Sequence, residues 1–115
     1  MSETPAARRR LLIVDDDPEF LESMQDLFEG LYDITAVDRA DQALPVVMRD
    51  RPEVVLLDLD LGSDLSGFDV LAYLKQLDDP PRVVMLTGDE RIETVVQCVR
   101  AGAVDYICKP PNPAA

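Results

Sequence analysis

The sequence predicts an α/β domain in which a parallel sheet is covered by helices on both faces. Short continuous apolar runs, typical of strands buried on both faces, alternate with stretches whose apolar residues recur at helical spacing. With 115 residues, 47% of them hydrophobic, the chain can bury one core and not two. We therefore expect a single α/β domain.

Two strands and two helices are expected in the amino-terminal half. Leu11–Val14 is an apolar run that ends at three aspartates, Pro18 suits the first turn of a helix, and Gly30 ends that helix. Tyr32–Val37 indicates a second strand. The helical pattern after it contains Pro45, which should shorten or distort the second helix. The apolar positions of these helices are Phe20, Leu21, Met24, Leu27 and Phe28, then Ala40, Ala43, Leu44, Val47 and Met48.

Three strands and two helices are expected in the rest of the chain. The strands are Val54–Leu57, Arg82–Leu86 and Val104–Cys108. Ser66–Asp69 resembles a capped helix start with an acidic residue at its third position, and Gly102 ends the helix that follows the fourth strand. The apolar positions are Val70, Leu71, Leu74 and Leu77 in one helix and Ile92, Val95, Val96 and Val99 in the other.

Polar side chains follow the predicted strands at one edge of the sheet. They are Asp15 and Asp16 after the first strand, Asp58 after the third, Thr87 after the fourth and Lys109 after the fifth. Doubly wound sheets bind ligands at this edge, so these groups should converge. Clustered carboxylates repel one another unless a cation is present, and Mg²⁺ fits because it prefers oxygen ligands and bridges carboxylates to phosphate. Calcium fits less well, because the aspartate run lacks the spacing and glycine of a calcium loop.

Such a cluster has a chemical use. Asp58 could attack a phosphoryl group and form an acyl phosphate, while Lys109 and the Thr87 hydroxyl contact the transferring oxygens. Taken singly, the aspartates after the first strand could merely cap a helix, and Lys109 could be an ordinary surface lysine. The placement of all these groups at strand ends favours the chemical interpretation.

Composition argues against several other classes. Acidic residues outnumber basic ones 23 to 11, so direct nucleic-acid binding is not expected, and Arg8–Arg10 is interpreted as a solvated strand entry. The absence of histidine excludes histidine-based catalysis and histidine metal sites. No apolar run has the length of a membrane span and no signal peptide is recognisable, so we expect a cytoplasmic protein without membrane contact. Cys98 and Cys108 are expected to be reduced and buried.

Four motifs, in this order, resemble those of the response-regulator receiver family of two-component signalling. They are Leu11–Asp17, Val54–Asp58, Met85–Gly88 and Tyr106–Pro110. The resemblance covers about residues 10 to 110. It implies a flavodoxin-like, doubly wound sheet of five parallel strands in the order 2-1-3-4-5. The expected organisation is a leader at 1–9, a receiver domain at 10–110 and a tail at 111–115.

The resemblance also implies a role for each residue of the cluster. Asp58 would be the phosphoacceptor, with Lys109 and Thr87 as catalytic partners. The Mg²⁺ ligands would be Asp15, Asp16, Asp58 and Asp60, of which Asp15 acts through water and Asp60 through its backbone carbonyl. Thr87 and Tyr106 would form a switch that changes contacts with a downstream protein target. A histidine kinase or phosphotransfer protein would supply the phosphoryl group, and the domain would not turn over an external substrate.

The sequence departs from the family pattern in two places. Gly62 stands where the family usually has a proline, four residues after the phosphoacceptor. The usual fifth helix is missing, because only 111–115 follow Pro110. Part of one sheet face would then lie uncovered, and exposed apolar area favours association. We therefore expect either a homodimer formed through this face or a fragment of a longer protein.

Two other functions share parts of this pattern. Val55–Asp60, a later threonine and a lysine resemble the haloacid-dehalogenase-type phosphatases, which also form an aspartyl phosphate. That family needs a further acidic pair after the lysine, and no acidic residue follows Lys109. A flavin-binding module would need hydroxyl and glycine donors in its first loop, where this chain has aspartates.

Overall fold

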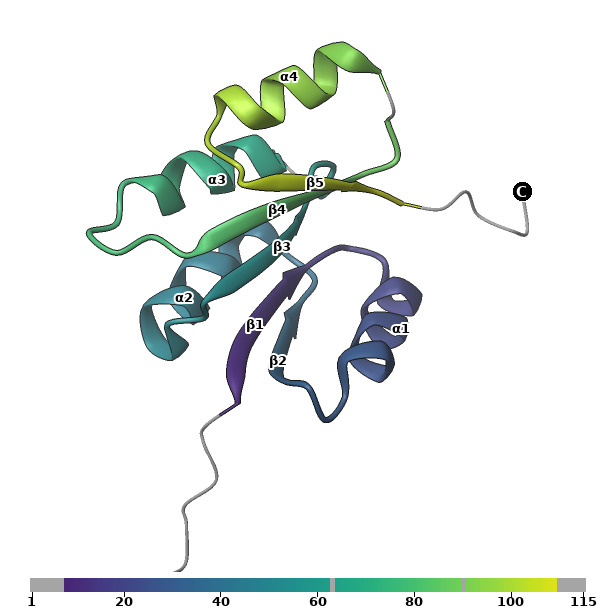
Figure 1. Ribbon diagram of the computed structural model, residues 1–115, viewed down its shortest axis with the longest axis vertical. Helices are drawn as coiled ribbons and strands as arrows, with labels where there is room; N and C mark the ends of the chain where they lie inside the picture. The colour runs from purple at the N-terminus through teal and green to yellow at the C-terminus, as the bar shows by residue number, and fades with distance from the viewer. Residues whose placement is uncertain (1–7, 63, 90, 110–115) are drawn as a thin grey trace, which may run out of the picture.

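The computed structural model describes residues 8–62, 64–89 and 91–109, which form a three-layer α/β fold (Figure 1). The elements in chain order are β1 (Arg9–Val14), α1 (Pro18–Phe28), β2 (Tyr32–Val37), η1 (Ala40–Gln42), α2 (Ala43–Asp50), β3 (Val54–Asp58), α3 (Gly67–Lys75), β4 (Arg82–Thr87), α4 (Ile92–Arg100) and β5 (Asp105–Cys108). The strands are all parallel and lie in the order β2-β1-β3-β4-β5. The predicted fold class and strand order are confirmed.

The strand register aligns the carboxyl ends of the central strands. Val14 of β1 lies beside Leu57 of β3, and Asp58 lies beside Leu86 of β4. Toward their carboxyl ends the side chains of these strands are mostly buried, on both faces of the sheet. Every residue that directly follows β1, β3 or β4 is therefore delivered to the same edge of the sheet.

The helix starts follow from local sequence. The Asp17 side chain caps α1 by accepting a hydrogen bond from the Glu19 N–H, and Pro18 occupies the first turn. Ser66 and Asp69 form a reciprocal capping box at the start of α3, as predicted. Pro45 has the predicted effect on the second helix, which begins with the 3₁₀ turn η1 before α2.

The helix α4 is confirmed, but its predicted apolar positions do not form its buried face. Ile92 and Val99 are 78% and 62% exposed, whereas Thr94 and Cys98 are buried. The helix lies along the β5 side of the molecule, where there is little sheet to cover (Figure 1). Cys98 is fully buried and Cys108 is half-buried.

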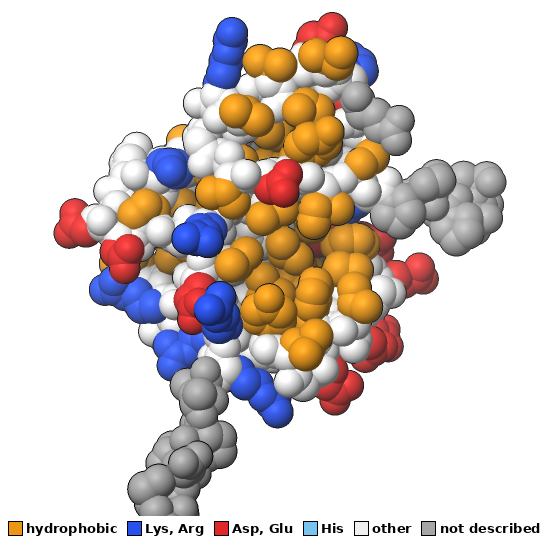
Figure 2. Space-filling model, in the orientation of Figure 1, with side chains coloured by type: hydrophobic (Ala, Val, Ile, Leu, Met, Phe, Trp, Pro, Cys, Tyr) orange, Lys and Arg blue, Asp and Glu red, His pale blue; other side chains and the backbone are white. Residues whose placement is uncertain are grey.

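The two faces of the sheet are covered unequally. One face packs against α2, α3 and Cys98 of α4, while the other packs against α1. On the α1 face Ile107 lies beside the buried Leu86 but is itself 50% exposed. Figure 2 shows hydrophobic side chains gathered over the sheet between α1 and α4. The described residues contain four α-helices. No fifth helix was expected after Pro110, and residues 110–115 lie outside the described part of the chain.

No helix in the described part of the chain is long and apolar enough to cross a membrane.

Candidate functional site

Three of the predicted site residues meet at the carboxyl edge of the sheet. Asp15 follows β1, Asp58 ends β3 and Lys109 follows β5. The Lys109 Nζ lies 2.5 Å from Asp15 Oδ2 and 3.1 Å from Asp58 Oδ2. Both carboxylates are buried, with Asp15 at 0% and Asp58 at 5% exposed. One ammonium group thus bridges two buried carboxylates that are 43 residues apart in the sequence, as their numbers 15 and 58 show.

Lys109 is held over this pair from a second side. Its Nζ lies 4.5 Å from the centroid of the Phe20 ring, a cation–π distance. Phe20 belongs to the first turn of α1. The ring and the two carboxylates leave the ammonium group little freedom to turn outward.

The local electrostatics reflect this crowding. Burial and the neighbouring Asp15 carboxylate raise the pKa of Asp58 to about 6, although Lys109 acts in the opposite direction. Burial acts to lower the pKa of Lys109, but the Asp15 and Asp58 carboxylates outweigh it and the pKa is raised. Lys109 therefore stays charged at neutral pH, and one cation is not enough to neutralise two buried carboxylates.

Backbone donors orient the carboxylates. The Asp17 N–H donates to Asp15 Oδ1 at 2.9 Å, and the Asp60 N–H donates to Asp58 Oδ1 at 3.2 Å. In each case one carboxylate oxygen accepts a hydrogen bond from the backbone N–H of the residue two positions later. The other oxygen of each points to Lys109.

The start of α3 packs directly on the backbone of Asp58. A Cβ atom on Gly67 would lie 2.3 Å from the Asp58 carbonyl oxygen and 2.8 Å from Leu59 Cα. The Gly67 N–H donates to the Leu59 carbonyl at 2.9 Å. Only glycine allows this close approach, which fixes where the strand ends and therefore where the Asp58 side chain starts.

The carboxylates form a candidate metal-binding set. Asp15, Asp16 and Asp58 each offer an oxygen within 4.8 Å of the others, and Asp16 is the exposed member of the set. Asp15 Oδ2 is buried and accepts no well-aligned hydrogen bond from the described residues, so its charge is balanced only by the Lys109 contact. Buried oxygens with unused acceptor capacity and an exposed third carboxylate fit a hard divalent cation such as Mg²⁺.

The loop after Asp58 approaches the same set. Gly62 has a φ of +63°, and a Cβ atom on it would lie 2.9 Å from Asp16 Oδ2. Proline cannot adopt this φ, so the sequence difference at position 62 corresponds to a different loop backbone. Asp60 lies in this loop with its side chain exposed and accepts a hydrogen bond from the Gly62 N–H at 3.2 Å.

The predicted switch residues lie on β4 and β5 beside the site, and among the described residues no hydrogen bond joins either of them to Asp58. Thr87 is buried at the end of β4, and its hydroxyl accepts a hydrogen bond from the Asp89 N–H at 2.9 Å. The Asp89 carboxylate is in turn clamped by Arg91 and by the Thr94 hydroxyl at 2.7 Å, which holds its pKa well below the usual range. Tyr106 is 36% exposed on β5, beside Met85.

Sequence reasoning missed several parts of the site. It did not anticipate the cation–π contact of Phe20, the steric role of Gly67 or the Arg91–Thr94 clamp on Asp89. Gly67 carried a signal, because it is a glycine at the first position of a helix, where the chain has no conformational need for it. The other two depend on packing between elements and leave no local pattern.

Comparisons with known proteins agree with this geometry. The family model described as "Response regulator receiver domain" matches residues 11–115. The alginate biosynthesis transcriptional regulatory protein AlgB of Pseudomonas aeruginosa is 35% identical over 98% of the chain, which covers 25% of that protein. The DNA-binding response regulator MtrA of Mycolicibacterium smegmatis is 38% identical over 92% of the chain, which covers 46% of it. The chain thus spans a quarter to a half of these relatives.

A solved structure shows the same fold. The signal receiver domain of the putative LuxO repressor protein from Vibrio parahaemolyticus superposes with a TM-score of 0.82 and 31% identity. The match covers 91% of this chain and 81% of that one.

Proposed function

The chain belongs to the response-regulator receiver family, and from this premise we propose that it accepts a phosphoryl group on Asp58 in a Mg²⁺-dependent reaction. The observation that supports this most strongly is the buried Asp58 carboxylate, which shares Lys109 with Asp15 and lies within reach of the exposed Asp16. Residues 10–110 would form the receiver domain, with 1–9 as a leader and 111–115 as a tail.

Asp58 is the nucleophile in this proposal. A carboxylate oxygen of Asp58 attacks the phosphorus atom, an acyl phosphate bond forms, and the bond to the donor's leaving group breaks with its electron pair on that group. The raised pKa of Asp58 shows that the site penalises the ionised form, which at a pKa of about 6 still predominates at neutral pH, and a bound divalent cation would remove much of that penalty.

The other residues would stabilise charge on the transferring group. Lys109 would exchange its contact with Asp58 Oδ2 for a phosphoryl oxygen, because its side chain already reaches that carboxylate. The Thr87 hydroxyl would donate to another phosphoryl oxygen after moving toward the site. Tyr106, half-exposed on the neighbouring strand, would turn inward into the space left by Thr87 and report the change to a partner.

Asp16, Asp58 and the backbone carbonyl of Asp60 would hold Mg²⁺ directly, with Asp15 acting through water. The metal supplies charge neutralisation for the clustered carboxylates and for the transferring phosphoryl group. The exposed position of Asp16 and the unused acceptor capacity of the buried Asp15 Oδ2 support this assignment. Calcium remains the weaker candidate, because the aspartates lack a calcium-loop arrangement.

The partners would be proteins. A sensor histidine kinase or phosphotransfer protein would supply the phosphoryl group, and a downstream protein would read the switch, in a cytoplasmic setting and without turnover of an external substrate. A homodimer through the partly uncovered α1 face is the companion proposal, supported by the exposed Ile107 on that face. We do not propose direct nucleic-acid binding by these residues, because acidic residues outnumber basic ones 23 to 11. One relative is nevertheless named as a DNA-binding regulator.

Phosphorylation with acetyl phosphate tests the proposal. Wild type and Asp58→Asn are incubated with and without Mg²⁺, and intact mass is measured. We expect one phosphate-sized mass gain that requires both Mg²⁺ and Asp58. No gain in folded wild type would contradict the proposal, and turnover of small phosphate esters would favour the dehalogenase-type phosphatase, for which the comparisons give no support.

A further inference from the structure

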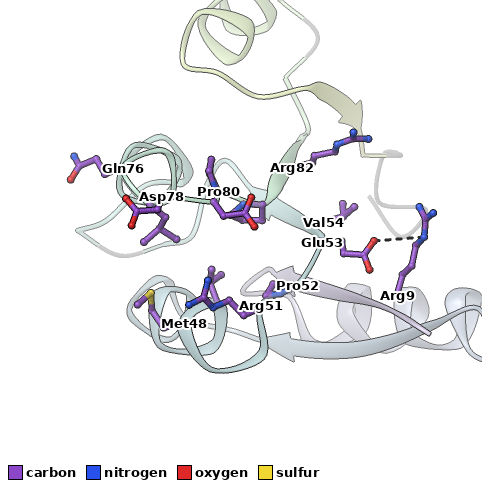
Figure 3. Close-up of a pocket in the computed structure, with 14 residues that line it drawn as sticks. Arg9, Met48, Arg51, Pro52, Glu53, Val54, Gln76, Asp78, Pro80 and Arg82 are labelled. Carbon is purple, nitrogen blue, oxygen red and sulfur yellow. Dashed lines mark ion pairs between the residues drawn. The ribbon is translucent and has the colours of Figure 1, made fainter. Parts of the chain in front are cut away.

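A cavity of about 680 Å³ lies at the opposite end of the sheet from Asp58 (Figure 3). It runs between the carboxyl end of α2, with the loop that follows it, and the loop from α3 to β4. We call it the amino-end groove because the first residues of β1, β3 and β4 also line it. Its volume is in the range of small-molecule sites, and none of its lining residues belongs to the carboxylate cluster.

The two walls of the amino-end groove carry opposite charges. Arg51 lies with Met48 on the α2 wall, and Asp78 lies on the wall formed by the α3–β4 loop (Figure 3). In the part of the chain that the structure describes, neither the Arg51 guanidinium nor the Asp78 carboxylate has a hydrogen bond or ion pair. By contrast, Arg9 and Glu53 pair with each other at 3.6 Å at the strand end of the groove.

Arg51 has an unusual backbone for its residue type. With φ 51° and ψ 56°, it is the only non-glycine residue with a positive φ in the described ranges. It follows the last turn of α2, where glycine or asparagine would be more relaxed. A cation there also favours the helix carboxyl terminus, but Arg49 in the last turn already supplies one. The long charged side chain at position 51 therefore suggests a use beyond ending the helix.

The floor of the groove between the charged walls is apolar. Pro52 and Val47 are buried there, Pro80 is half-buried, and Met48 is 54% exposed at the rim. An anion alone would be repelled by Asp78 and its neighbour Asp79, and a cation alone by Arg51 and Arg82. A molecule with both charges and an apolar side chain would satisfy both walls and the floor.

We propose that the amino-end groove binds a small zwitterion of the amino-acid class. Arg51 binds its carboxylate, Asp78 accepts hydrogen bonds from its ammonium group, and its apolar side chain lies against Met48, Pro52 and Pro80. This inference does not depend on phosphorylation of Asp58, because the two sites share no residue.

L-phenylalanine and two analogues test the inference on the full chain by amide NMR titration. 3-Phenylpropanoate lacks the ammonium group, and 2-phenylethylamine lacks the carboxylate. We expect saturable shifts at groove residues with L-phenylalanine and about fivefold weaker binding of each analogue, the upper end for one exposed charge contact. Arg51→Gln should weaken the binding of L-phenylalanine and 3-phenylpropanoate by about fivefold and leave the binding of 2-phenylethylamine unchanged. Asp78→Asn should weaken the binding of L-phenylalanine and 2-phenylethylamine by about fivefold and leave the binding of 3-phenylpropanoate unchanged.

Arg100→Gln is the matched control, because it removes an exposed arginine from the last turn of α4, away from the groove, and should change nothing. Arg51→Gly should weaken L-phenylalanine as Arg51→Gln does and should also raise the melting temperature by relaxing the backbone. The inference is overturned if L-phenylalanine gives no saturable shifts up to roughly 20 mM, if its shifts map to the exposed α1 face, or if the three compounds bind equally well to wild type and both charge variants.

Discussion

The contact between Gly67 and the end of β3 makes a quantitative prediction. In Gly67→Ala the new Cβ would lie 2.3 Å from the Asp58 carbonyl oxygen, about 1 Å inside ordinary contact. The opposing atoms are backbone, so α3 or the end of β3 must move. Overpacking of this kind costs about 1–3 kcal/mol, and the better helix propensity of alanine returns at most about 1 kcal/mol. We expect a net loss of about 1–2 kcal/mol, or about 4–8 °C in melting temperature for a chain of this length.

Gly88→Ala is the matched control, because Gly88 also follows a strand end at the site but a Cβ there meets nothing within 4 Å. Its melting temperature should stay within about 2 °C of wild type. Thermal unfolding followed by circular dichroism in EDTA measures both variants, and phosphorylation by acetyl phosphate should slow only in Gly67→Ala. Equal melting temperatures for Gly67→Ala and wild type, or an equal loss in Gly88→Ala, would refute the steric argument.

Three further predictions follow from the site and the capping box. Folding raises the pKa of Asp58 from 3.8 to about 6, so ionised Asp58 lowers the unfolding free energy of the metal-free protein by about 3 kcal/mol. This loss grows as the pH rises from about 4 to 6 and persists at higher pH. Asp58→Asn should therefore melt higher than wild type at pH ~7.5 in EDTA and not at pH ~4.5; a pH-independent difference would contradict this. Lys109→Gln leaves two buried carboxylates without their cation and should lose about 2 kcal/mol at neutral pH, yet bind Mg²⁺ more tightly because no ammonium group competes; calorimetric titration showing weaker Mg²⁺ binding would count against it. Ser66→Ala removes the cap of α3 and should lower the unfolding free energy by about 1 kcal/mol in urea denaturation, while Ser66→Asp should largely retain it; no loss in the alanine variant would show that the cap is not stabilising.

The predictable part of the fold was encoded locally. Continuous apolar runs identified the central strands, and Pro18, Ser66 and Gly102 marked helix boundaries that the structure confirms. The helix α4 shows the limit of this reasoning. Its apolar spacing predicted a helix correctly, but which face is buried depends on how the helix packs on the sheet. The buried Thr94 has its hydroxyl satisfied by Asp89.

The candidate site was predictable for a topological reason. Parallel strands bring their carboxyl ends to one edge, so Asp15 and Asp58 were expected at the same edge once the strands were assigned. The strand order implied by the family resemblance then made them neighbours, as the structure confirms. The distances to Lys109, the Phe20 ring above it and the charged walls of the amino-end groove depend on side-chain packing between separate segments. No periodicity or motif records such contacts, and the left-handed backbone of Arg51 has no sequence signal of its own.

The central claim is that the acyl phosphate forms on Asp58 and on no other carboxylate of the cluster. Borohydride reduction of the phosphorylated protein converts an aspartyl phosphate to homoserine, and peptide mass mapping then identifies the position. We expect homoserine at position 58 alone, and only when Mg²⁺ was present. Homoserine at Asp15, Asp16 or Asp60 in the wild type, or none anywhere after a confirmed mass gain, would contradict it.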